Sequence, residues 1–358
     1  MTTTTRIALL PGDGIGAEVT GAALAVLRAV GRRFGRRFEF EHCLIGGAAL
    51  RAHDAALPRA TLDACRAADA VLLGAVGDPA FDREPAGRRP EIGLLELRLA
   101  LGSYANLRPV RLWPGLETAS PLRPDRVQGL DLIIVRELTG GLYFGQPRGF
   151  DAERGEAFNT MRYTAPEVER IAAVAFRLAA SRRGSVVSVD KANVLETSRL
   201  WRTVVERVAS RFPDVRLDHQ YVDSCALSLV LEPRNYDVIL TENLFGDILS
   251  DQAGGLAGSL GLLPSASLGE GPGLFEPVHG SAPALAGRDA ANPVGAILSA
   301  AMLLRHTGAA AEASAVESAV AAQFVERRCT SDLAHAVGVS PASCSQVADA
   351  VAAHVEAA

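Results

Sequence analysis

Lysine is almost absent from this chain: Lys191 is the single lysine among 36 lysine and arginine residues. Because nearly every basic residue of this chain is arginine, we expect the one lysine to occupy a position where a guanidinium could not replace its amine. The alternative is that this lysine was retained by chance. A partly buried ammonium can lose its proton near neutral pH, whereas arginine stays charged. Lys191 follows the apolar run 186–189, which predicts a buried strand that ends at a functional loop. We therefore interpret Lys191 as a candidate catalytic base.

Three other features are scarce, and each excludes a class of protein. The five cysteines are scattered without a Cys-x-x-Cys pair, which disfavours disulfide frameworks and zinc knuckles and is typical of a cytoplasmic protein. The net charge of −5 leaves no basic excess, so we expect no nucleic-acid partner. The apolar stretches 6–10 and 293–304 are too short for a signal peptide and a membrane span, so we expect no membrane role.

The order of apolar runs and glycine turns predicts an α/β fold. A strand at 7–10, a glycine-rich turn at 11–16 and a helix at 17–32 open the chain, and 358 residues suggest two domains. The glycines at 12, 14 and 16 do not complete the Rossmann fingerprint. Further strands are expected at 38–44, 70–74, 132–136, 186–189, 217–222 and 238–241.

Two tracts lack apolar patterning. Residues 144–164 are polar and glycine-rich, which indicates a projecting arm or hairpin. Residues 254–280 carry many glycines and three prolines, and we interpret them as a long loop that is functional or disordered.

Acidic residues predict a metal site. Asp247 and Asp251 stand four apart, so a helix would place both carboxylates on one face, with no Lys or Arg between them. Such a pair is often just a solvated surface, but its apolar neighbours argue against full exposure. A hard cation, Mg²⁺ or Mn²⁺, would neutralise the pair, and Asp223 after the strand at 217–222 could complete the oxygen shell.

Arginines and one tyrosine predict an anion-binding pocket. Arg98 on a helix, Arg108 in a turn and Arg136 at a strand end could pair with a substrate that bears two carboxylates, although each alone could be structural. Tyr143 follows a strand on a tight turn, where its phenol could donate a proton. Glu91, Leu94, Leu95 and Arg98 are spaced so that they share one face of a helix. This face could be a core stripe, but the charged residues at its two ends favour an apolar pocket beside a group that binds an acid.

Seven blocks in this order closely resemble the isocitrate/isopropylmalate dehydrogenase family of metal-dependent β-decarboxylating dehydrogenases. They are Leu-Pro-Gly-Asp-Gly-Ile-Gly, Gly-Leu-Leu-Glu-Leu-Arg, Ala-Asn-Leu-Arg-Pro, Val-Arg-Glu-Leu-Thr-Gly-Gly-Leu-Tyr-Phe-Gly, Asp-Lys-Ala-Asn-Val-Leu, Asn-Leu-Phe-Gly-Asp-Ile-Leu-Ser-Asp and Glu-Pro-Val-His-Gly-Ser-Ala-Pro. The resemblance implies a two-domain α/β fold with a mixed central sheet that is not a Rossmann fold. It implies a cofactor-binding domain from residues 1–104 plus 258–358, and a substrate and dimerisation domain from 105–257 with an arm at about 144–164.

The resemblance also assigns roles. Lys191 would be the base and Tyr143 the proton donor, and a homodimer would share its active sites, with Asp247 and Asp251 from one subunit and Asp223 and Lys191 from the other. The substrate would contact Arg98, Arg108, Arg136, Leu94, Leu95, Val194, Glu91 and Asn193. NAD would contact Glu276, His279, Gly280, Ser281, Ala282 and Asn292.

The implied reaction is the NAD-dependent oxidative decarboxylation of 3-isopropylmalate to 4-methyl-2-oxopentanoate in leucine biosynthesis, or of a close 3-alkylmalate in a specialised pathway. A D-malate or tartrate dehydrogenase is an alternative, which Leu94 and Leu95 disfavour, and a catalytically silent partner subunit is another. One departure concerns the cofactor: Ala284 stands where NAD-using relatives generally carry Asp and NADP-using ones Lys. NAD remains the expected cofactor, with relaxed selectivity.

Overall fold

A computed structural model describes residues 4–358 of the chain, which divides into two compact units. Unit 1 comprises Met1–Ser103, Trp113–Pro121 and Ala257–Ala358, so it draws on both ends of the chain. Unit 2 comprises Tyr104–Leu112 and Leu122–Leu256. Residues 113–121 belong to unit 1, although they lie within the central range 105–257 expected for a separate domain.

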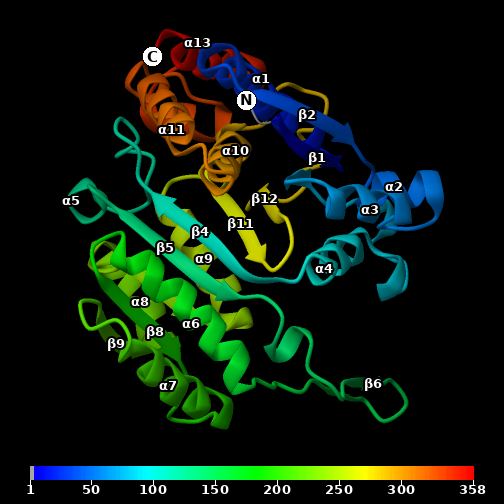
Figure 1. Ribbon diagram of the computed structural model, residues 1–358, viewed down its shortest axis with the longest axis vertical. Helices are drawn as coiled ribbons and strands as arrows, with labels where there is room; N and C mark the ends of the chain where they lie inside the picture. Colours follow the sequence, from blue (N-terminus) through cyan, green and yellow to red (C-terminus); the bar gives the residue numbers. More distant parts are fainter. Residues whose placement is uncertain (1–3) are drawn as a thin grey trace. The chain divides into compact units, whose positions relative to one another are not determined.

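Unit 1 is a mixed sheet segment between two layers of helices (Figure 1). Its strands lie in the order β2-β1-β3-β12-β11; only the β11–β12 pair is antiparallel. This order and mixed direction differ from the parallel Rossmann sheet, as expected from the sequence. The strands are β1 (Thr4–Gly12), β2 (Arg37–His42), β3 (Ala70–Ala75), β11 (Pro264–Gly269) and β12 (Gly273–Pro277).

The strands of unit 1 are covered by helices on both faces. One layer contains α1 (Gly16–Phe34), α10 (Val294–His306), α11 (Ala310–Val325) and α13 (Cys344–Ala357). The other contains α2 (Gly46–His53), α3 (Arg59–Ala67) and α4 (Pro90–Ala100), and α12 (Ser331–Val337) precedes α13. Residues 7–10 of β1 are all buried, because each face of the strand meets a helix layer.

Unit 2 repeats this layered plan with its own core. Its strands lie in the order β4-β5-β10-β8-β9, with β4–β5 antiparallel and the rest parallel. Helices α6 and α7 bury Phe176 and Trp201 against one face, and α8 and α9 pack on the other (Figure 1). The strands are β4 (Ser103–Arg111), β5 (Asp131–Glu137), β8 (Ser185–Asp190), β9 (Arg216–Tyr221) and β10 (Val238–Thr241). The helices are α5 (Pro124–Val127), α6 (Ala165–Ala180), α7 (Glu196–Ala209), α8 (Val222–Leu231) and α9 (Asn243–Leu256).

Two local predictions were wrong. The tract 254–280, interpreted as a long loop, contains strands β11 and β12, in which Ala266, Leu274 and Phe275 are buried. Arg108, placed in a turn, lies inside β4, where Pro109 pairs in register with Ile133. In both places glycine and proline suggested a turn, but the pairing and burial provided by neighbouring strands decided the conformation.

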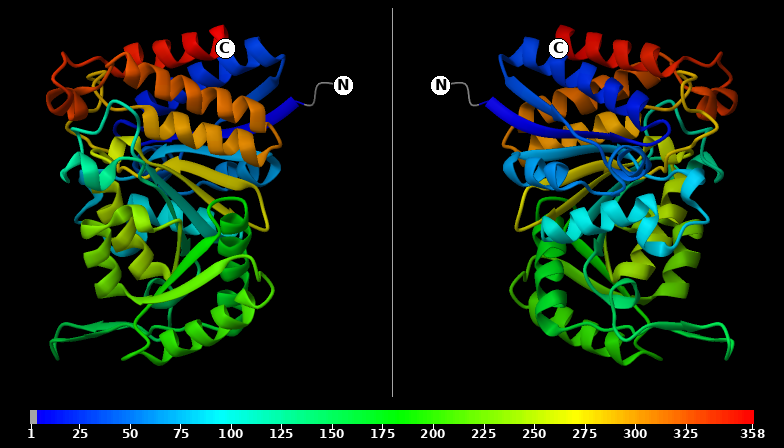
Figure 2. Two further views of the ribbon diagram at one scale, coloured as in Figure 1. Left: turned by 90° about the vertical axis from the view of Figure 1, so that its left-hand side faces the viewer. Right: turned by 90° about the vertical axis from the view of Figure 1, so that its right-hand side faces the viewer.

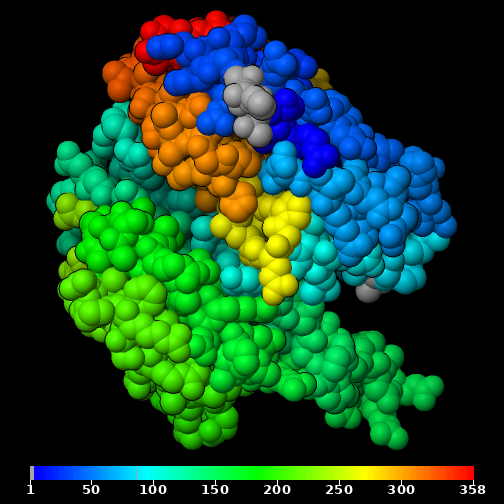
Figure 3. Space-filling model, viewed as in Figure 1, coloured from blue at the N-terminus to red at the C-terminus, as the bar shows by residue number. Residues whose placement is uncertain are grey.

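Residues 144–164 include a small hairpin, formed by β6 (Gly149–Asp151) and β7 (Glu156–Phe158). It extends away from the helices of unit 2 (Figure 2) and stands out from that unit in the space-filling view (Figure 3). Phe150 is 81% exposed and Phe158 is 48% exposed, so two large apolar side chains of the hairpin face solvent in the single chain. None of the helices within residues 4–358 combines the length and apolar character needed to cross a bilayer.

The backbone amides of the glycine-rich turn after β1 donate to carbonyls of the same chain and not to an anion. The N–H groups of Asp13 and Ile15 donate to the carbonyls of Ala75 and Ser281, both at 2.8 Å. Gly14 has φ +55°, and a Cβ there would lie 2.0 Å from the Ser281 carbonyl oxygen. These amides already donate to backbone carbonyls, and the Asp13 carboxylate adds a negative charge to the turn. The turn therefore cannot serve as a pyrophosphate cradle.

The buried carboxylate of Asp13 joins three loops of unit 1. It accepts hydrogen bonds from the N–H groups of Gly47 (2.9 Å), Ala48 (2.8 Å) and Gly77 (3.0 Å). The first two are the orphan donors at the start of α2, which has no side-chain cap of its own. Asp13 therefore performs the capping function from a distant position in the sequence.

We expect Asp13→Ala to lower the free energy of unfolding by about 2–4 kcal/mol, because it leaves buried amide donors without an acceptor. Urea unfolding followed by circular dichroism measures this change. Asp349→Ala, which removes an exposed carboxylate from α13, is the matched control and should change stability by less than about 0.5 kcal/mol. Equal effects of the two substitutions would contradict the role of Asp13.

Candidate active site

Unit 2 brings Arg136, Tyr143 and Asp247 together at one polar cluster. Arg136 is the second-last residue of β5 and its side chain is buried, and its guanidinium forms an ion pair with Asp247. The Tyr143 hydroxyl donates to the other carboxylate oxygen of Asp247 at 2.7 Å. Arg136 also lies 5.6 Å from the centre of the Tyr143 ring. Asp247 is thus held between a cation and a phenol.

Helix α9 carries Asp247 and Asp251 on one face, as their spacing predicted. The helix begins after Glu242, whose carboxylate accepts from the N–H groups of Leu244 (3.1 Å) and Phe245 (2.8 Å). Gly246 lets the helix approach β5, because a Cβ there would lie 2.7 Å from Cγ of Arg136. The close approach is what places Asp247 against the arginine.

Arg108 on β4 reaches the same helix. Its guanidinium donates to the Ser250 hydroxyl at 2.6 Å and to Asp251 at 3.2 Å, and it lies 3.4 Å from Asp247. Its Nε donates to the side chain of Asn106 at 2.9 Å. Two arginines and two aspartates therefore alternate along one side of unit 2.

The charges of this cluster shift its ionisable groups in different directions. Burial would raise the pKa of Asp247, but Arg136, the Tyr143 hydroxyl and Arg108 together hold that pKa below its usual range. Burial raises the pKa of Asp251, and the neighbouring Asp247 adds to the increase while Arg108 opposes it. Burial and the adjacent Asp247 raise the pKa of Tyr143 to about 12. Tyr143 therefore keeps its proton at neutral pH, as a proton donor must.

Lys191 and Asp223 form a second cluster in unit 2. The Lys191 ammonium donates to Asp223, which is in the first turn of α8, and this bond holds the pKa of Asp223 below its usual range. The backbone N–H of Lys191 donates to the Ser198 hydroxyl at 3.0 Å. The ring of Tyr221 lies 5.9 Å from Lys191 Nζ. These contacts hold the start of the loop after β8.

The structure does not assemble the three predicted metal ligands within one chain. Among residues 4–358, Asp223, Asp247 and Asp251 do not form a group whose ligand atoms lie within 4.8 Å of one another. Val194 and Asn193, which follow Lys191, are exposed, and Val194 is 63% exposed. The Lys191 cluster thus presents its predicted substrate-contacting residues to solvent.

The other predicted substrate residues lie in unit 1 on α4. Arg98 forms an ion pair with Glu276 on β12, at 2.6 Å, and both side chains are largely buried. Leu94 and Leu95 are half-buried, whereas Gly93 and Leu97 form the core-facing side of the helix. Glu91, at the start of the same stripe, is exposed. Leu94 also packs against the core cluster of unit 1, so the stripe from Glu91 to Arg98 faces away from the core only in part.

The predicted cofactor residues also lie in unit 1: Glu276 is on β12, and the others follow this strand. Ser281 is buried, Gly280 is exposed and Ala282 adopts φ +37°. The Nδ1–H of His279 donates to the Gly280 carbonyl at 2.9 Å, which leaves Nε2 as a buried acceptor without a partner. Asn292 accepts from Val294 N–H at 3.1 Å and donates to Asp332 at 3.0 Å.

His279 should make unit 1 less stable in mild acid. Burial lowers its pKa from 6.5 in the folded protein, so the neutral ring contributes stability that is full above about pH 6.5. That contribution is lost as the pH falls through the folded-state pKa, because the unfolded chain binds the proton first. We expect urea unfolding to show a smaller loss of stability between pH 7.5 and pH 5.5 in His279→Gln than in the unchanged protein. Equal losses would contradict this assignment.

Two residues of the Arg136 cluster were missed in the sequence. Asn243 accepts from Arg136 Nε at 3.1 Å and from Nη2 at 2.8 Å, so it fixes the plane of the guanidinium. Ser250 holds Arg108. Helical spacing could have found them, since residues 243, 247, 250 and 251 share one face of α9.

The chain belongs to the isocitrate/isopropylmalate dehydrogenase family, whose model matches residues 6–351. This agrees with the α/β fold of mixed strand direction and with the resemblance seen in the sequence.

Several relatives within the family are highly similar along nearly the whole chain. The 3-isopropylmalate dehydrogenase of Geobacillus kaustophilus is 58% identical over 337 residues, which cover 93% of this chain and 91% of the relative. The enzyme of the same name from Parasynechococcus marenigrum is 54% identical and covers 97% and 98%. Among solved structures, isocitrate dehydrogenase from Methylococcus capsulatus is 36% identical with a TM-score of 0.88, covering 98% and 99% of the two chains.

Proposed function

We propose that this chain catalyses the NAD-dependent oxidative decarboxylation of 3-isopropylmalate to 4-methyl-2-oxopentanoate, a step of leucine biosynthesis. Relatives named 3-isopropylmalate dehydrogenase share 54–58% identity with it. The observation that carries the proposal is the cluster in which Tyr143, Arg136 and Asp247 contact one another. It joins a proton donor, a carboxylate-binding cation and a metal-ligating acid.

The reaction needs one base and one acid, and the chain provides both. Lys191 Nζ accepts the proton of the substrate hydroxyl as that carbon is oxidised, which requires the amine to be uncharged. Arg108 and Arg136 bind and orient the malate carboxylates by paired hydrogen bonds. After carbon dioxide leaves, the Tyr143 hydroxyl delivers a proton to the enolate carbon.

A divalent cation fits the acids of unit 2. Asp247 and Asp251 provide only hard oxygen donors, which suit Mg²⁺ or Mn²⁺, and Asp251 projects a carboxylate that is 62% exposed. When bound, the cation acts as a Lewis acid on the hydroxyl and on the developing enolate. Asp223 would provide the third carboxylate.

We propose that unit 1 binds NAD through the segment after β12. His279 Nε2 is a buried acceptor that a bound ligand could satisfy. Gly280, Ser281 and Ala282 would lie against the cofactor, with Glu276 and Asn292 beside them. NAD, when bound, accepts the hydride. Ala284 is exposed and carries neither an acid nor a base, so we expect weak discrimination between NAD and NADP.

We propose a homodimer with shared active sites. The separation of Lys191 and Asp223 from the Asp247 cluster supports it, because a second chain can bring the two clusters together. Exposed apolar side chains also support it: Leu227 on α8 is 61% exposed and Ile248 on α9 is 58% exposed, in addition to the aromatic residues of the β6–β7 hairpin. The free thiols of all five cysteines suit the cytoplasm, where we place the enzyme.

We propose that Leu94 and Leu95, which are half-buried on α4, form the apolar pocket for the alkyl group. An apolar pocket of this kind separates neighbouring alkyl groups by only about 1–3 kcal/mol per methylene, so activity on close 3-alkylmalates is expected. D-malate, which has no alkyl group, should be a poor substrate.

The test is NADH formation from 3-isopropylmalate, D-malate, isocitrate and homoisocitrate, with NAD or NADP and with or without Mn²⁺. We expect Mn²⁺-dependent turnover, with 3-isopropylmalate giving the highest kcat/KM. A preference for D-malate would replace the substrate assignment. Absence of turnover with every 2-hydroxy acid would favour a silent partner subunit.

A further inference from the structure

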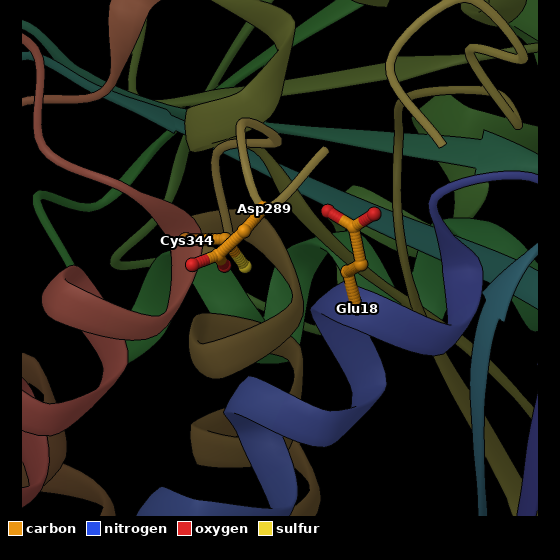
Figure 4. A group of neighbouring side chains, drawn as sticks. All are labelled: Glu18, Asp289 and Cys344. Carbon is orange, nitrogen blue, oxygen red and sulfur yellow. The ribbon is translucent and has the colours of Figure 1, made fainter. Parts of the chain in front are cut away.

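Three potential metal ligands meet in unit 1, among residues not used above. Glu18 is in the first turn of α1, Asp289 follows the turn after the predicted cofactor segment, and Cys344 begins α13 (Figure 4). One ligand atom from each of the three side chains lies within 4.8 Å of the other two. Three segments far apart in the sequence thus converge on one point.

The thiol of Cys344 is buried and has no hydrogen-bond partner among the residues that the structure describes. The residue is 2% exposed, and it packs with Ala22 of α1 and Ala348 of α13. A buried cysteine surrounded only by such neighbours would behave as a small apolar side chain. Here, however, its sulfur also lies within 4.8 Å of a carboxylate oxygen of Glu18 and of Asp289, so its surroundings are not purely apolar.

The two carboxylates have hydrogen bonds but no cation. Glu18 accepts from the Gly287 N–H through one oxygen, while its other oxygen, Oε2, is buried and has no hydrogen-bond partner within residues 4–358. Asp289 accepts from the N–H of Ser345 at 2.8 Å and from its hydroxyl. Within residues 4–358, neither acid forms an ion pair, although the chain has 36 lysine and arginine residues. Among residues 4–358, the cluster thus holds one carboxylate oxygen, Glu18 Oε2, and one sulfur that have no hydrogen-bond partner.

We propose that Glu18, Asp289 and Cys344 bind one divalent transition-metal ion of the zinc type. A cysteine thiolate with carboxylates suits borderline ions such as Zn²⁺ or Co²⁺ and does not suit Mg²⁺, which prefers oxygen ligands alone. On binding, the thiol proton is released to solvent and sulfur forms a bond to the metal. Because Asp289 is exposed, water can provide the fourth ligand of a tetrahedral site.

The site would join α1, the segment 287–289 and α13. The same segment follows Ala284, so a bound ion would restrain the chain that continues from the proposed NAD contacts. Its role is structural, and it is independent of the catalytic cation proposed at Asp247 and Asp251.

Cobalt provides a direct test, because a thiolate bound to Co²⁺ gives a charge-transfer absorption in the near ultraviolet that oxygen ligands do not. We expect the full-length, chelator-treated protein to take up one equivalent of Co²⁺ with this absorption, and Zn²⁺ to displace it. Zn²⁺ should also raise the melting temperature by a few degrees. Asp251→Asn, which alters the proposed catalytic metal site, should leave the absorption unchanged.

The variants locate the ligands. Cys344→Ala should abolish the absorption and the zinc-dependent rise in melting temperature, and Glu18→Gln should weaken Co²⁺ binding at least tenfold. Cys329→Ala, which removes another buried thiol of unit 1, is the matched control and should retain both signals. If Cys344→Ala fails to fold, the Co²⁺ affinity and absorption of Glu18→Gln alone test the proposal. Absorption that is absent from the unchanged protein, or that persists at full strength in Glu18→Gln, would overturn the proposal.

Discussion

Lys191→Ala should lower kcat by about 10²- to 10⁴-fold, the range expected when a general base is removed. The substitution deletes the amine that we propose as the acceptor of the hydroxyl proton and leaves Arg108, Arg136 and Asp247 in place. We therefore expect KM for 3-isopropylmalate to change much less than kcat. Steady-state kinetics at saturating NAD and Mn²⁺ measure the two effects separately.

Lys191→Arg is the informative companion variant. Arginine keeps the positive charge and the hydrogen bond to Asp223 but cannot act as a base near neutral pH. It should be about as inactive as the alanine variant, and a small primary amine added to Lys191→Ala should restore part of the turnover. An arginine variant that works at full speed would show that the residue acts only as a cation.

The single lysine also permits a chemical version of this experiment. Amine-selective acylation can modify only one side chain in the sequence, Lys191. Loss of activity should follow the extent of modification at the peptide that contains this residue, as measured by mass spectrometry. Substrate with Mn²⁺ should protect against it. Full activity after complete acylation would contradict the proposed base.

Asp247→Asn should lower kcat/KM by about 10²- to 10³-fold or more, a loss comparable to removing a main electrostatic contact of the transition state. The amide cannot neutralise Arg136 and Arg108, and it replaces the anionic metal ligand proposed here by a neutral group. The concentration of Mn²⁺ that gives half-maximal activity should rise in the same variant. Assays over a Mn²⁺ series measure both changes.

The matched control is Asp218→Asn on β9, where an exposed aspartate pairs with Arg216. It should leave kcat/KM within about twofold, since surface ion pairs contribute little. Thermal unfolding of the Asp247 variant separates misfolding from lost chemistry. Activity that stays close to that of the unchanged enzyme, or that survives complete removal of divalent cations, would refute the metal assignment.

The sequence predicted best where one local pattern determines the structure. Residues 186–189 and 238–241 are apolar apart from Ser188 and Thr241, and both segments are buried strands, as such short runs in parallel sheets usually are. The spacing of Asp247 and Asp251 predicted their common face on α9 for a similarly local reason.

Prediction failed where distant segments provide the stabilising contacts. The glycines and prolines of β11 and β12 predict a loop. The two strands form because they pair with each other and because β12 also pairs with β3, which is distant in the sequence. The role of Asp13 was equally hidden: its three amide donors come from positions 47, 48 and 77. No pattern within a short window of sequence carries that information.

By itself, the sequence determined the chemical inventory of this protein: one lysine, three candidate metal-ligating acids, three candidate substrate arginines and the tyrosine, in an α/β chain. Residue types and helical spacing are sufficient for that, because they depend on neighbours a few positions away. Only the tertiary structure decided which groups meet. It paired Tyr143 and Arg136 with Asp247, placed Lys191 with Asp223, and put Glu18, Asp289 and Cys344 within reach of one ion. Such pairings depend on how separate strands and helices pack, and packing is a property of the whole fold.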